Sequence, residues 1–453
     1  MSDDTSTSSD AGALWHPEID TMPWDLLQDR LLGDFRDQVT RLRGHDIWRE
    51  RLTEVGGLAH FDDLVSVPFT TKEDLRNAQA ETSAEEPVGR FQLVAAHELR
   101  QITSSSGTTG TPVFFGLTEH DLARWNSAIG NAFRTAGVGA GSIVAHTTGM
   151  AIVAGGLPYA DGIRAAGGAL AWIGGQTTPR MAVAMERTRA NTLISTASFA
   201  SHFATRCEEE LGRSAHELSV RTVIAGGEPG AGVPHIRQGI LDAWGATRVS
   251  ELMGLGDVLP ALWAECHVGQ GMHFTAAPDV LVELIDPVTL EHVPWEPGAS
   301  GEAVYTTLGR QASAVVRFRS RDQLQVTAVT CACGRTAPTV RCVGRTDDML
   351  IYKAMNVYPS AIRDIVLDVA TAHLTGTMRI RKDTVDQVRF DDALPLEVEL
   401  RDGADADAAA AALREAESRV RDQLRVRVVI EPFPPGVLPV SDYKNALTYA
   451  RTR

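Results

Sequence analysis

The chain has 453 residues, of which 43% are hydrophobic and 22% are charged, a composition typical of a soluble globular protein with two or three domains. Its formal net charge of −15 argues against nucleic acid or an anionic membrane as the main partner, because both repel an acidic protein. No apolar run reaches the roughly 18–20 residues that a membrane span requires, so we expect no membrane partner.

The N-terminal stretch MSDDTSTSSDAG is polar and acidic, and it lacks the basic and apolar regions of a secretion signal. We therefore expect residues 1–15 to form a disordered tail. The five cysteines of this long chain are expected to be reduced thiols rather than a disulfide framework. These features together predict a cytoplasmic protein.

The first predicted element is an amphipathic helix over Trp24–Val55, where apolar residues recur at spacings of three and four. Residues 114–125 (FFGLTEHDLARW) predict a short strand and then a helix with Thr118 as its N-cap. From Ile143 to Val326, short apolar runs alternate with helical patterns. This alternation predicts an α/β layered domain with largely parallel strands.

A different pattern begins after Gly344. Met349–Ile351 and residues 396–400 (LEVEL) are expected to be strands, Pro359–Val369 an amphipathic helix, and Ala404–Leu424 an alanine-rich helix. The order βαβαβ over residues 345–453 predicts a small, separate α+β domain.

The stretch Thr103–Pro112 (TSSSGTTGTP) carries seven hydroxyl side chains and two glycines in ten residues. The glycines allow tight turns, after which amides and hydroxyls can converge on an anion such as a phosphate. An ordinary polar surface loop is the alternative. Because the stretch has no lysine, it is not a GxxxxGK[ST] loop. If it binds ATP, the positive charge and the metal ligand must come from elsewhere.

This loop resembles the phosphate loop of the adenylate-forming enzymes, which include acyl-CoA synthetases, peptide-synthetase adenylation domains and luciferases. Other stretches resemble the phenylacetate–CoA ligase branch of that superfamily, in the same order and over nearly the whole chain. They are HPEIDTMPWDLLQ (16–28), LVSVPFTTKEDLRN (64–77), AGGEPG (225–230), VVRFRSRDQL (315–324), GRTDDMLIYKAMNVYPSAI (344–362) and LPVSDYK (438–444).

The resemblance implies a large N-terminal layered α/β adenylation domain over residues 16–346 and a small mobile α+β domain over residues 347–453. Asp347 matches the hinge at which the small domain swings. Two half-reactions are implied: ATP activates a carboxylic acid as an acyl-adenylate with release of pyrophosphate, and a nucleophile then displaces AMP.

The implied ATP site draws residues from four of the matching stretches. Its members are Ser104, Ser105, Ser106, Gly107, Thr108, Thr109, Gly110, Gly227, Glu228, Pro229, Asp322, Arg345 and Asn356. Asp322 matches the aspartate that holds both ribose hydroxyls, a task that suits a carboxylate because it can accept two hydrogen bonds. Arg317 and Arg319 are expected to make structural ion pairs instead.

Catalysis is assigned through the same resemblance to Thr108, Asp257 and Lys444. Lys444 matches a lysine that reaches the α-phosphate and the carboxylate, and it would supply the cation that the loop lacks. The family motif that helps to hold Mg²⁺, Tyr-Gly-x-[Ser/Thr]-Glu, is here Met253-Gly254-Leu255-Gly256-Asp257. Asp257 keeps a carboxylate on a shorter stem, and nearby Glu251 is the alternative Mg²⁺ ligand.

Two further stretches hold residues that suit a tetrahedral metal: Cys266, His273, Cys331 and Cys333. Three thiolates and one imidazole fit structural Zn²⁺, and some members of this branch carry such a site. His267 is the alternative imidazole, and buried free thiols are the alternative to a metal site. Cys207 and Cys342 are expected to be core residues.

The resemblance places the acyl group against residues 147–167, with contacts to Met150, Val153, Gly155, Gly226 and Gly254. These residues predict a small, flat, apolar pocket that would take a small aromatic carboxylic acid.

CoA is the first expected acyl acceptor. However, Lys353-Ala354-Met355-Asn356 replaces the family's Arg-Gly-Val-Asn, where the pantetheine thiol passes. An amine, a hydroxyl or a carrier protein in secondary metabolism is therefore the alternative acceptor. A catalytically silent nucleotide-binding regulator is a third interpretation, against which Lys444 and Asp322 argue. The sequence leaves a homodimer open.

Overall fold

The computed structural model describes residues 14–105, 112–149, 152–228, 230–346, 348–353, 355–384, 387–439 and 447–450. The chain divides into two compact units. The first unit includes the chain up to residue 341, except for residues 233–235 and 321–323. These two short segments belong to the second unit, together with residues 342 onward. Among the described helices, none combines the length and the apolarity needed to cross a bilayer.

Short helices make up the N-terminal part of the first unit: α1 (Pro17–Asp20), α2 (Trp24–Leu42), α3 (Asp46–Arg51), η1 (Phe61–Ser66), α4 (Lys72–Ala78) and η2 (Ala96–Glu98). The single helix predicted over Trp24–Val55 is therefore wrong in extent. Gly44 disfavours helix continuation, and His45 takes an extended conformation directly before α3. The break lets Leu42 and Trp48 both bury their side chains.

A two-stranded hairpin, β1 (Gln101–Ser104) and β2 (Phe114–Leu117), precedes helix α5 (Glu119–Ala136). Strand β2 and helix α5 confirm the prediction for residues 114–125, and Thr118 is the N-cap. The Thr118 hydroxyl accepts a hydrogen bond from the Asp121 amide, while the Asp121 carboxylate accepts one from the Thr118 amide. This reciprocal capping fixes where the helix starts.

An eleven-stranded sheet runs through the first unit in the order β10-β11-β12-β13-β9-β8-β7-β6-β5-β3-β4. Its strands are β3 (Ile143–His146), β4 (Ala169–Trp172), β5 (Thr192–Ser195), β6 (Thr222–Gly226), β7 (Arg248–Leu255), β8 (Leu259–Glu265), β9 (Met272–Phe274), β10 (Val280–Ile285), β11 (Ser300–Thr307), β12 (Phe318–Ala328) and β13 (Thr339–Arg345).

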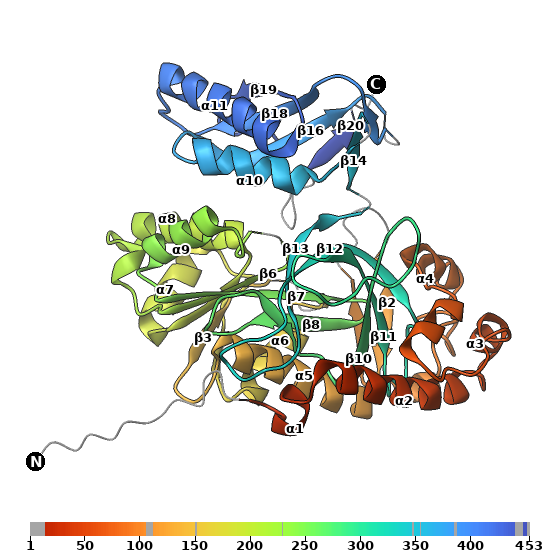
Figure 1. The fold of residues 1–453 in the computed structure, drawn as a ribbon. Helices are drawn as coiled ribbons and strands as arrows, with labels where there is room; N and C mark the ends of the chain where they lie inside the picture. The colour runs from red at the N-terminus through yellow and green to blue at the C-terminus, as the bar shows by residue number, and fades with distance from the viewer. Residues whose placement is uncertain are drawn as a thin grey trace, which may run out of the picture. The chain divides into compact units, whose positions relative to one another are not determined.

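Strands β3 to β7 are parallel, and helices connect them. The connecting helices are α6 (Leu157–Ala165), α7 (Thr178–Thr188), α8 (Ala197–Leu211) and α9 (Pro234–Trp244). Figure 1 shows α7, α8 and α9 together on one face of these strands and α5 and α6 on the other. Phe203 and Trp244 pack with Leu193 and Val223 of the sheet in a continuous buried cluster. The predicted α/β layers are confirmed in this part.

From β7 onward, the strand pairs are antiparallel: β7 with β8, β8 with β9, β9 with β13, and β10 with β11. The prediction of largely parallel strands up to Val326 is therefore wrong for this half. Residues 248–345 are all described and contain no helix, so the chain has no crossover of the kind that parallel pairing requires.

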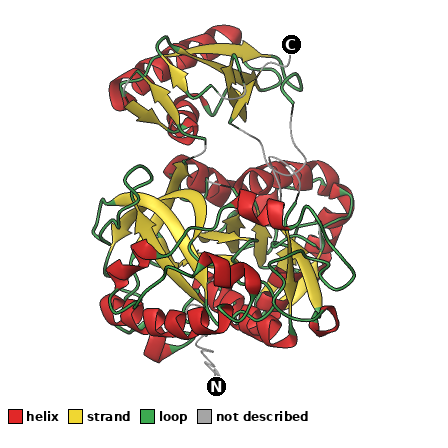
Figure 2. Ribbon diagram, turned by 90° about the vertical axis from the view of Figure 1, so that its right-hand side faces the viewer, coloured by secondary structure: helices red, strands yellow, loops and turns green. Residues whose placement is uncertain are grey.

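The second unit contains β14 (Leu350–Tyr352), β15 (Met355–Val357), α10 (Pro359–Ala370), β16 (Leu374–Lys382), β17 (Arg389–Phe390), β18 (Leu394–Leu400), α11 (Ala406–Leu424), β19 (Val428–Phe433) and β20 (Thr448–Ala450). Helices α10 and α11 pack together against the sheet β19-β18-β16-β20, as Figure 2 shows. The four elements predicted here are confirmed, but the order βαβαβ omits the strands β15, β16, β17 and β20.

Candidate active site

The base of the predicted phosphate loop is held by hydrogen bonds to the segment predicted to contact the acyl group. The amide of Ser104 donates to the Ile152 carbonyl over 2.9 Å, and Ser104 forms an isolated parallel bridge with Val153. The Ser105 amide donates to the Val113 carbonyl across the hairpin over 2.9 Å. The structure thus brings Ser104, Ser105 and Val153 together. The rest of the predicted loop, Ser106 to Gly110 with Thr108, lies outside the described residues.

Asp257 lies close to Ser105 at the base of this loop. It follows β7, and its carboxylate forms an ion pair with the ammonium group of Lys72. That ammonium also donates to the Ser105 hydroxyl over 2.6 Å. A Cβ atom on Gly256 would lie 3.0 Å from the Ser105 Cα. The absence of a side chain at position 256 therefore allows the Asp257 turn to approach the loop closely.

Lys72 is a residue of this site to which the sequence analysis gave no role. Its only sequence signal was its place in the matching stretch at residues 64–77, which carries no information about its partners. The contacts of Lys72 link residues that are 33 and 185 positions away in the chain.

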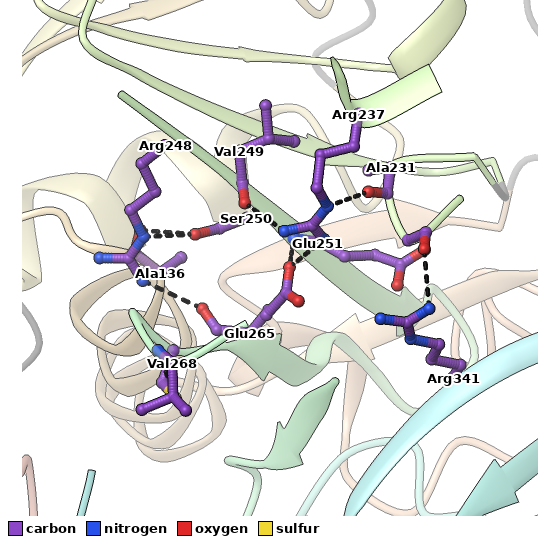
Figure 3. Close-up of polar contacts among 12 residues, drawn as sticks. Ala136, Ala231, Arg237, Arg248, Val249, Ser250, Glu251, Glu265, Val268 and Arg341 are labelled. Carbon is purple, nitrogen blue, oxygen red and sulfur yellow. Dashed lines mark hydrogen bonds and ion pairs between the residues drawn. The ribbon is translucent and has the colours of Figure 1, made fainter. Parts of the chain in front are cut away.

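The alternative metal ligand, Glu251, has different surroundings, which Figure 3 shows. Its side chain is buried beside Glu265, and its amide donates to the Glu265 carboxylate over 3.0 Å. A Cβ atom on Gly232 would lie 2.6 Å from its Oε2 atom. Burial, followed by the charge of Glu265, raises the pKa of Glu251 to about 7. These contacts are with the sheet and residue 232, whereas Asp257 is linked to the phosphate loop.

The AGGEPG stretch follows β6 as a tight turn. A Cβ atom on Gly226 would lie 2.5 Å from the Leu252 carbonyl oxygen, and Gly227 has a φ of +84°, so both positions favour glycine. The Glu228 carboxylate accepts a hydrogen bond from the Ser198 amide over 2.6 Å, at the start of α8. Pro229 lies outside the described residues.

Aromatic side chains border the segment predicted to contact the acyl group. The Tyr159 hydroxyl donates to the Pro260 carbonyl over 3.0 Å, and the Trp172 indole donates to the Thr148 carbonyl over 2.8 Å. Gly155 approaches Tyr159 closely enough that an added Cβ would touch its ring. Neither aromatic residue was predicted to be part of the site, although Tyr159 lies within residues 147–167. Met150 lies outside the described residues.

Gly254, another predicted substrate contact, has a packing role. A Cβ atom at this position would lie 1.9 Å from the carbonyl oxygen of Pro260 on β8. The register of β7 against β8 also shifts between Met253 and Leu255. Close backbone approach at this irregularity therefore requires glycine.

In the second unit, Asp322 and Arg345 form an ion pair over 3.0 Å. The structure thus brings together the two residues predicted to contact the ribose or phosphate. The Thr346 amide donates to the Arg321 carbonyl over 2.7 Å, which fixes the two segments side by side. Asp347, Ala354 and Lys444 lie outside the described residues, and of Asn356 only the backbone, in β15, is described.

The four predicted zinc ligands come together in the first unit: Cys266, His273, Cys331 and Cys333 have ligand atoms within 4.8 Å of one another. The Cys266 and Cys331 sulfurs are 3.7 Å apart, and the Cys333 sulfur is 3.4 Å from His273 Nε2. Tetrahedral Zn–S bonds of about 2.3 Å imply a sulfur–sulfur separation of about 3.8 Å. The residues therefore fit a closed, structural zinc site.

The surroundings of this cluster prepare it for a metal. His273 Nδ1 lies 3.1 Å from the Ala337 carbonyl oxygen, which turns Nε2 toward the sulfurs. The hydrogen bond with Cys266, helped by His273, holds the pKa of the Cys333 thiol well below its usual range. Cys207 is buried in the core as predicted, whereas Cys342 is only half-buried.

Comparison with known proteins agrees with this geometry. No family model matches the chain. The solved structure of 2-hydroxyisobutyryl-CoA ligase in the postadenylation state, in complex with R3-HIB-AMP, superposes with a TM-score of 0.86 at 25% identity. The match covers 98% of this chain and 93% of that chain. The fold and this similarity over nearly the whole chain thus define an adenylate-forming enzyme.

Curated relatives narrow the assignment. The chain is 30% identical over 343 residues to a phenylacetate–coenzyme A ligase of Pseudomonas putida, and the alignment covers 71% of each protein. It is 29% identical over 452 residues to the phenylacetate–coenzyme A ligase of Thermus thermophilus, covering 95% of this chain and 97% of the relative. This chain belongs to the phenylacetate–coenzyme A ligase family.

Proposed function

We propose that this protein is an AMP-forming acid–CoA ligase that activates a small aromatic carboxylic acid. In the first half-reaction, the acid carboxylate attacks the α-phosphate of ATP, giving an acyl-adenylate and pyrophosphate. In the second, the CoA thiol attacks the acyl carbon, and AMP leaves. The observation that carries this proposal is the contact of the phosphate-loop base with both the Asp257 turn and the Ile152–Val153 segment.

The residues at this junction are suited to binding ATP. Ser104 and Ser105 begin a loop whose amides and hydroxyls would receive the phosphates of ATP. Asp257 is the residue that would hold Mg²⁺, because a carboxylate oxygen beside the phosphates is a ligand that Mg²⁺ prefers. When bound, Mg²⁺ neutralises charge on the phosphate oxygens. Asp322 would accept hydrogen bonds from the ribose hydroxyls, and Lys444 would bring positive charge to the α-phosphate.

An aromatic acid is supported by the side chains around the acyl segment. Val153 is buried, and Gly155 adds no bulk beside the ring of Tyr159. A flat ring can stack on aromatic neighbours with a gain of about 0.5–1.5 kcal/mol beyond simple burial. The named activity of the curated relatives, on phenylacetate, points the same way.

An ATP–pyrophosphate exchange screen tests the acid. It would compare benzoates, hydroxybenzoates, aminobenzoates and phenylacetate with an aliphatic acid, 2-hydroxyisobutyrate. We expect exchange with at least one aromatic acid and little with the aliphatic one. The reverse preference would overturn the aromatic assignment while leaving the ligase class intact.

Mass spectrometry of the products tests the acceptor. With ATP, the best acid and CoA, we expect the mass of the acyl-CoA thioester, and the same reaction without CoA should stop at the adenylate. Formation of an ester or amide without CoA would instead support an amine, hydroxyl or carrier protein as the acceptor.

A further inference from the structure

We propose that Lys72 is a nucleotide-binding residue, which places positive charge beside the phosphate loop independently of Lys444. This inference rests on the proposed function. In this proposal, Lys72 of the first unit helps to bind the phosphates of ATP, and Lys444 acts at the α-phosphate.

The contacts of Lys72 define where its charge lies. Its ammonium group donates to the Ser105 hydroxyl over 2.6 Å and pairs with Asp257. The Lys72 side chain is 27% exposed, whereas that of Asp257 is 9% exposed. The Lys72 side chain is therefore partly exposed, whereas the Asp257 carboxylate that it pairs with is nearly buried.

The backbone around Lys72 is firmly anchored, so the position of this charge is a property of the fold. The Thr70 amide and hydroxyl donate to the Arg317 and Val316 carbonyls over 3.1 and 2.7 Å. The Arg319 amide donates back to the Thr70 carbonyl over 2.9 Å. Thr71 then caps α4, whose first residue is Lys72.

A lysine is unusual at any position of this chain. Among its 43 basic residues, only four are lysines, at positions 72, 353, 382 and 444. An ammonium group is a compact point charge with three donors that rotate freely, whereas a guanidinium group is a wider, planar fork. The compact group bonds both the Ser105 hydroxyl and the Asp257 carboxylate, and its rotating donors can turn to a phosphate oxygen.

The pairing with Asp257 gives Lys72 a second effect on nucleotide binding. Without a cation, the Asp257 carboxylate would repel the phosphates that it must help to bind. Lys72 offsets this charge before any nucleotide arrives. The site is therefore prepared for an anion even though the whole protein is acidic.

The test measures the dissociation constant of magnesium ATP by calorimetry on the full chain, without acid substrate. Lys72→Met should raise that constant by about 10- to 100-fold, the range expected for the loss of a charge-assisted hydrogen bond. Lys72→Arg keeps the charge and should show a smaller rise. Lys382→Met is the matched control on strand β16 and should bind as the wild type does.

A double variant separates phosphate binding from a purely structural role. If Lys72 served only to offset the charge of Asp257, Lys72→Met/Asp257→Asn would bind magnesium ATP as Asp257→Asn does, and that result would overturn the inference. These two variants both lack the Asp257 carboxylate and differ only in the Lys72 charge, so we expect the double variant to bind about 10-fold or more weakly than Asp257→Asn. Wild-type protein that binds no ATP would instead overturn the proposed function itself.

Discussion

His146 is buried in the core, where a protonated imidazole would be unfavourable. It ends β3 with its side chain fully buried, near the rings of Trp172 and Tyr159 at centroid distances of 5.5 and 6.2 Å. Burial lowers the pKa of His146 to about 4, although the Gly156 carbonyl partly opposes this. The imidazole is therefore neutral in the folded protein at neutral pH.

This pKa predicts acid sensitivity. Between about pH 6.5 and pH 4, the unfolded chain binds a proton at His146 that the folded chain does not, so stability falls as the pH falls. At pH 5 the loss from this residue is about 2 kcal/mol. Urea unfolding at pH 7 and pH 5 should show a smaller difference for His146→Gln than for the wild type. Equal differences would contradict the prediction.

The residues of the site were only partly predictable from the sequence. Asp257 and Asp322 could be named because the stretches around them match the family's, and the structure places them against Lys72 and Arg345, while their roles stay predictions. The contacts of Lys72 with Ser105 and of Glu228 with Ser198 could not be found, since they join segments that are distant in the sequence. The packing role of Gly254 depends on how closely strand β8 approaches it. The sequence around Gly254 alone does not show this approach.

At the scale of elements, Arg317 links the start of β12 to β10. Its guanidinium group bonds the Glu283 carboxylate at 3.0 and 2.7 Å and donates to the Val67 carbonyl over 2.8 Å. The side chains of Arg317 and Glu283 are 1% and 0% exposed. Arg319 pairs similarly with Glu302. The structural ion pairs expected from the sequence are confirmed.

Breaking the Arg317–Glu283 pair should be strongly destabilising. Glu283→Gln leaves the guanidinium group buried without a counter-ion, which typically costs about 3–5 kcal/mol. Urea unfolding of the purified variant measures this loss. Glu209→Gln, in an exposed pair with Arg206, is the control and should change stability by less than about 1 kcal/mol. Similar losses of stability in both variants would contradict the prediction that the buried ion pair contributes more than the exposed one.

Elements were predicted well where hydrophobic periodicity and capping residues agree, as in α5, α10 and α11. The break between α2 and α3 was missed because the apolar spacing continues across Gly44. The antiparallel half of the large sheet was missed for another reason. Strand direction depends on the connections between strands, and a short apolar run carries no sign of its direction.

At the scale of the whole molecule, the proposed zinc site predicts that removing the metal lowers the stability of the protein. Zinc would join the end of β8, strand β9 and the 331–333 loop, so its loss should loosen the first unit without removing a reacting group. Elemental analysis of protein purified without chelator should give one zinc per chain. Cys331→Ser should lower the zinc content and the thermal midpoint, whereas Cys342→Ser should keep the zinc. Protein free of zinc would rule out the site.

The role proposed for Lys444 predicts that its substitution slows the first half-reaction and spares the second. Lys444→Ala should slow ATP–pyrophosphate exchange by about a hundredfold or more, because positive charge is lost at the reacting phosphate. Thioester formation from a supplied acyl-adenylate should remain largely intact. Lys382→Ala serves as the matched control for both assays. Normal exchange by Lys444→Ala would remove this residue from catalysis.

The N-terminal segment of the first unit depends on residues that are synthesised much later. Thr70 bonds residues 316–319, the Arg317 guanidinium reaches Val67, and the Thr336 amide donates to the Asp20 carbonyl. At a translation rate of about 5–20 residues per second, roughly 250 residues take about 12–50 s to emerge. During synthesis, helices α1 to α4 therefore wait for these late partners. The surfaces that residues 316–336 cover in the finished protein stay open to chaperones and proteases until that unit is nearly complete.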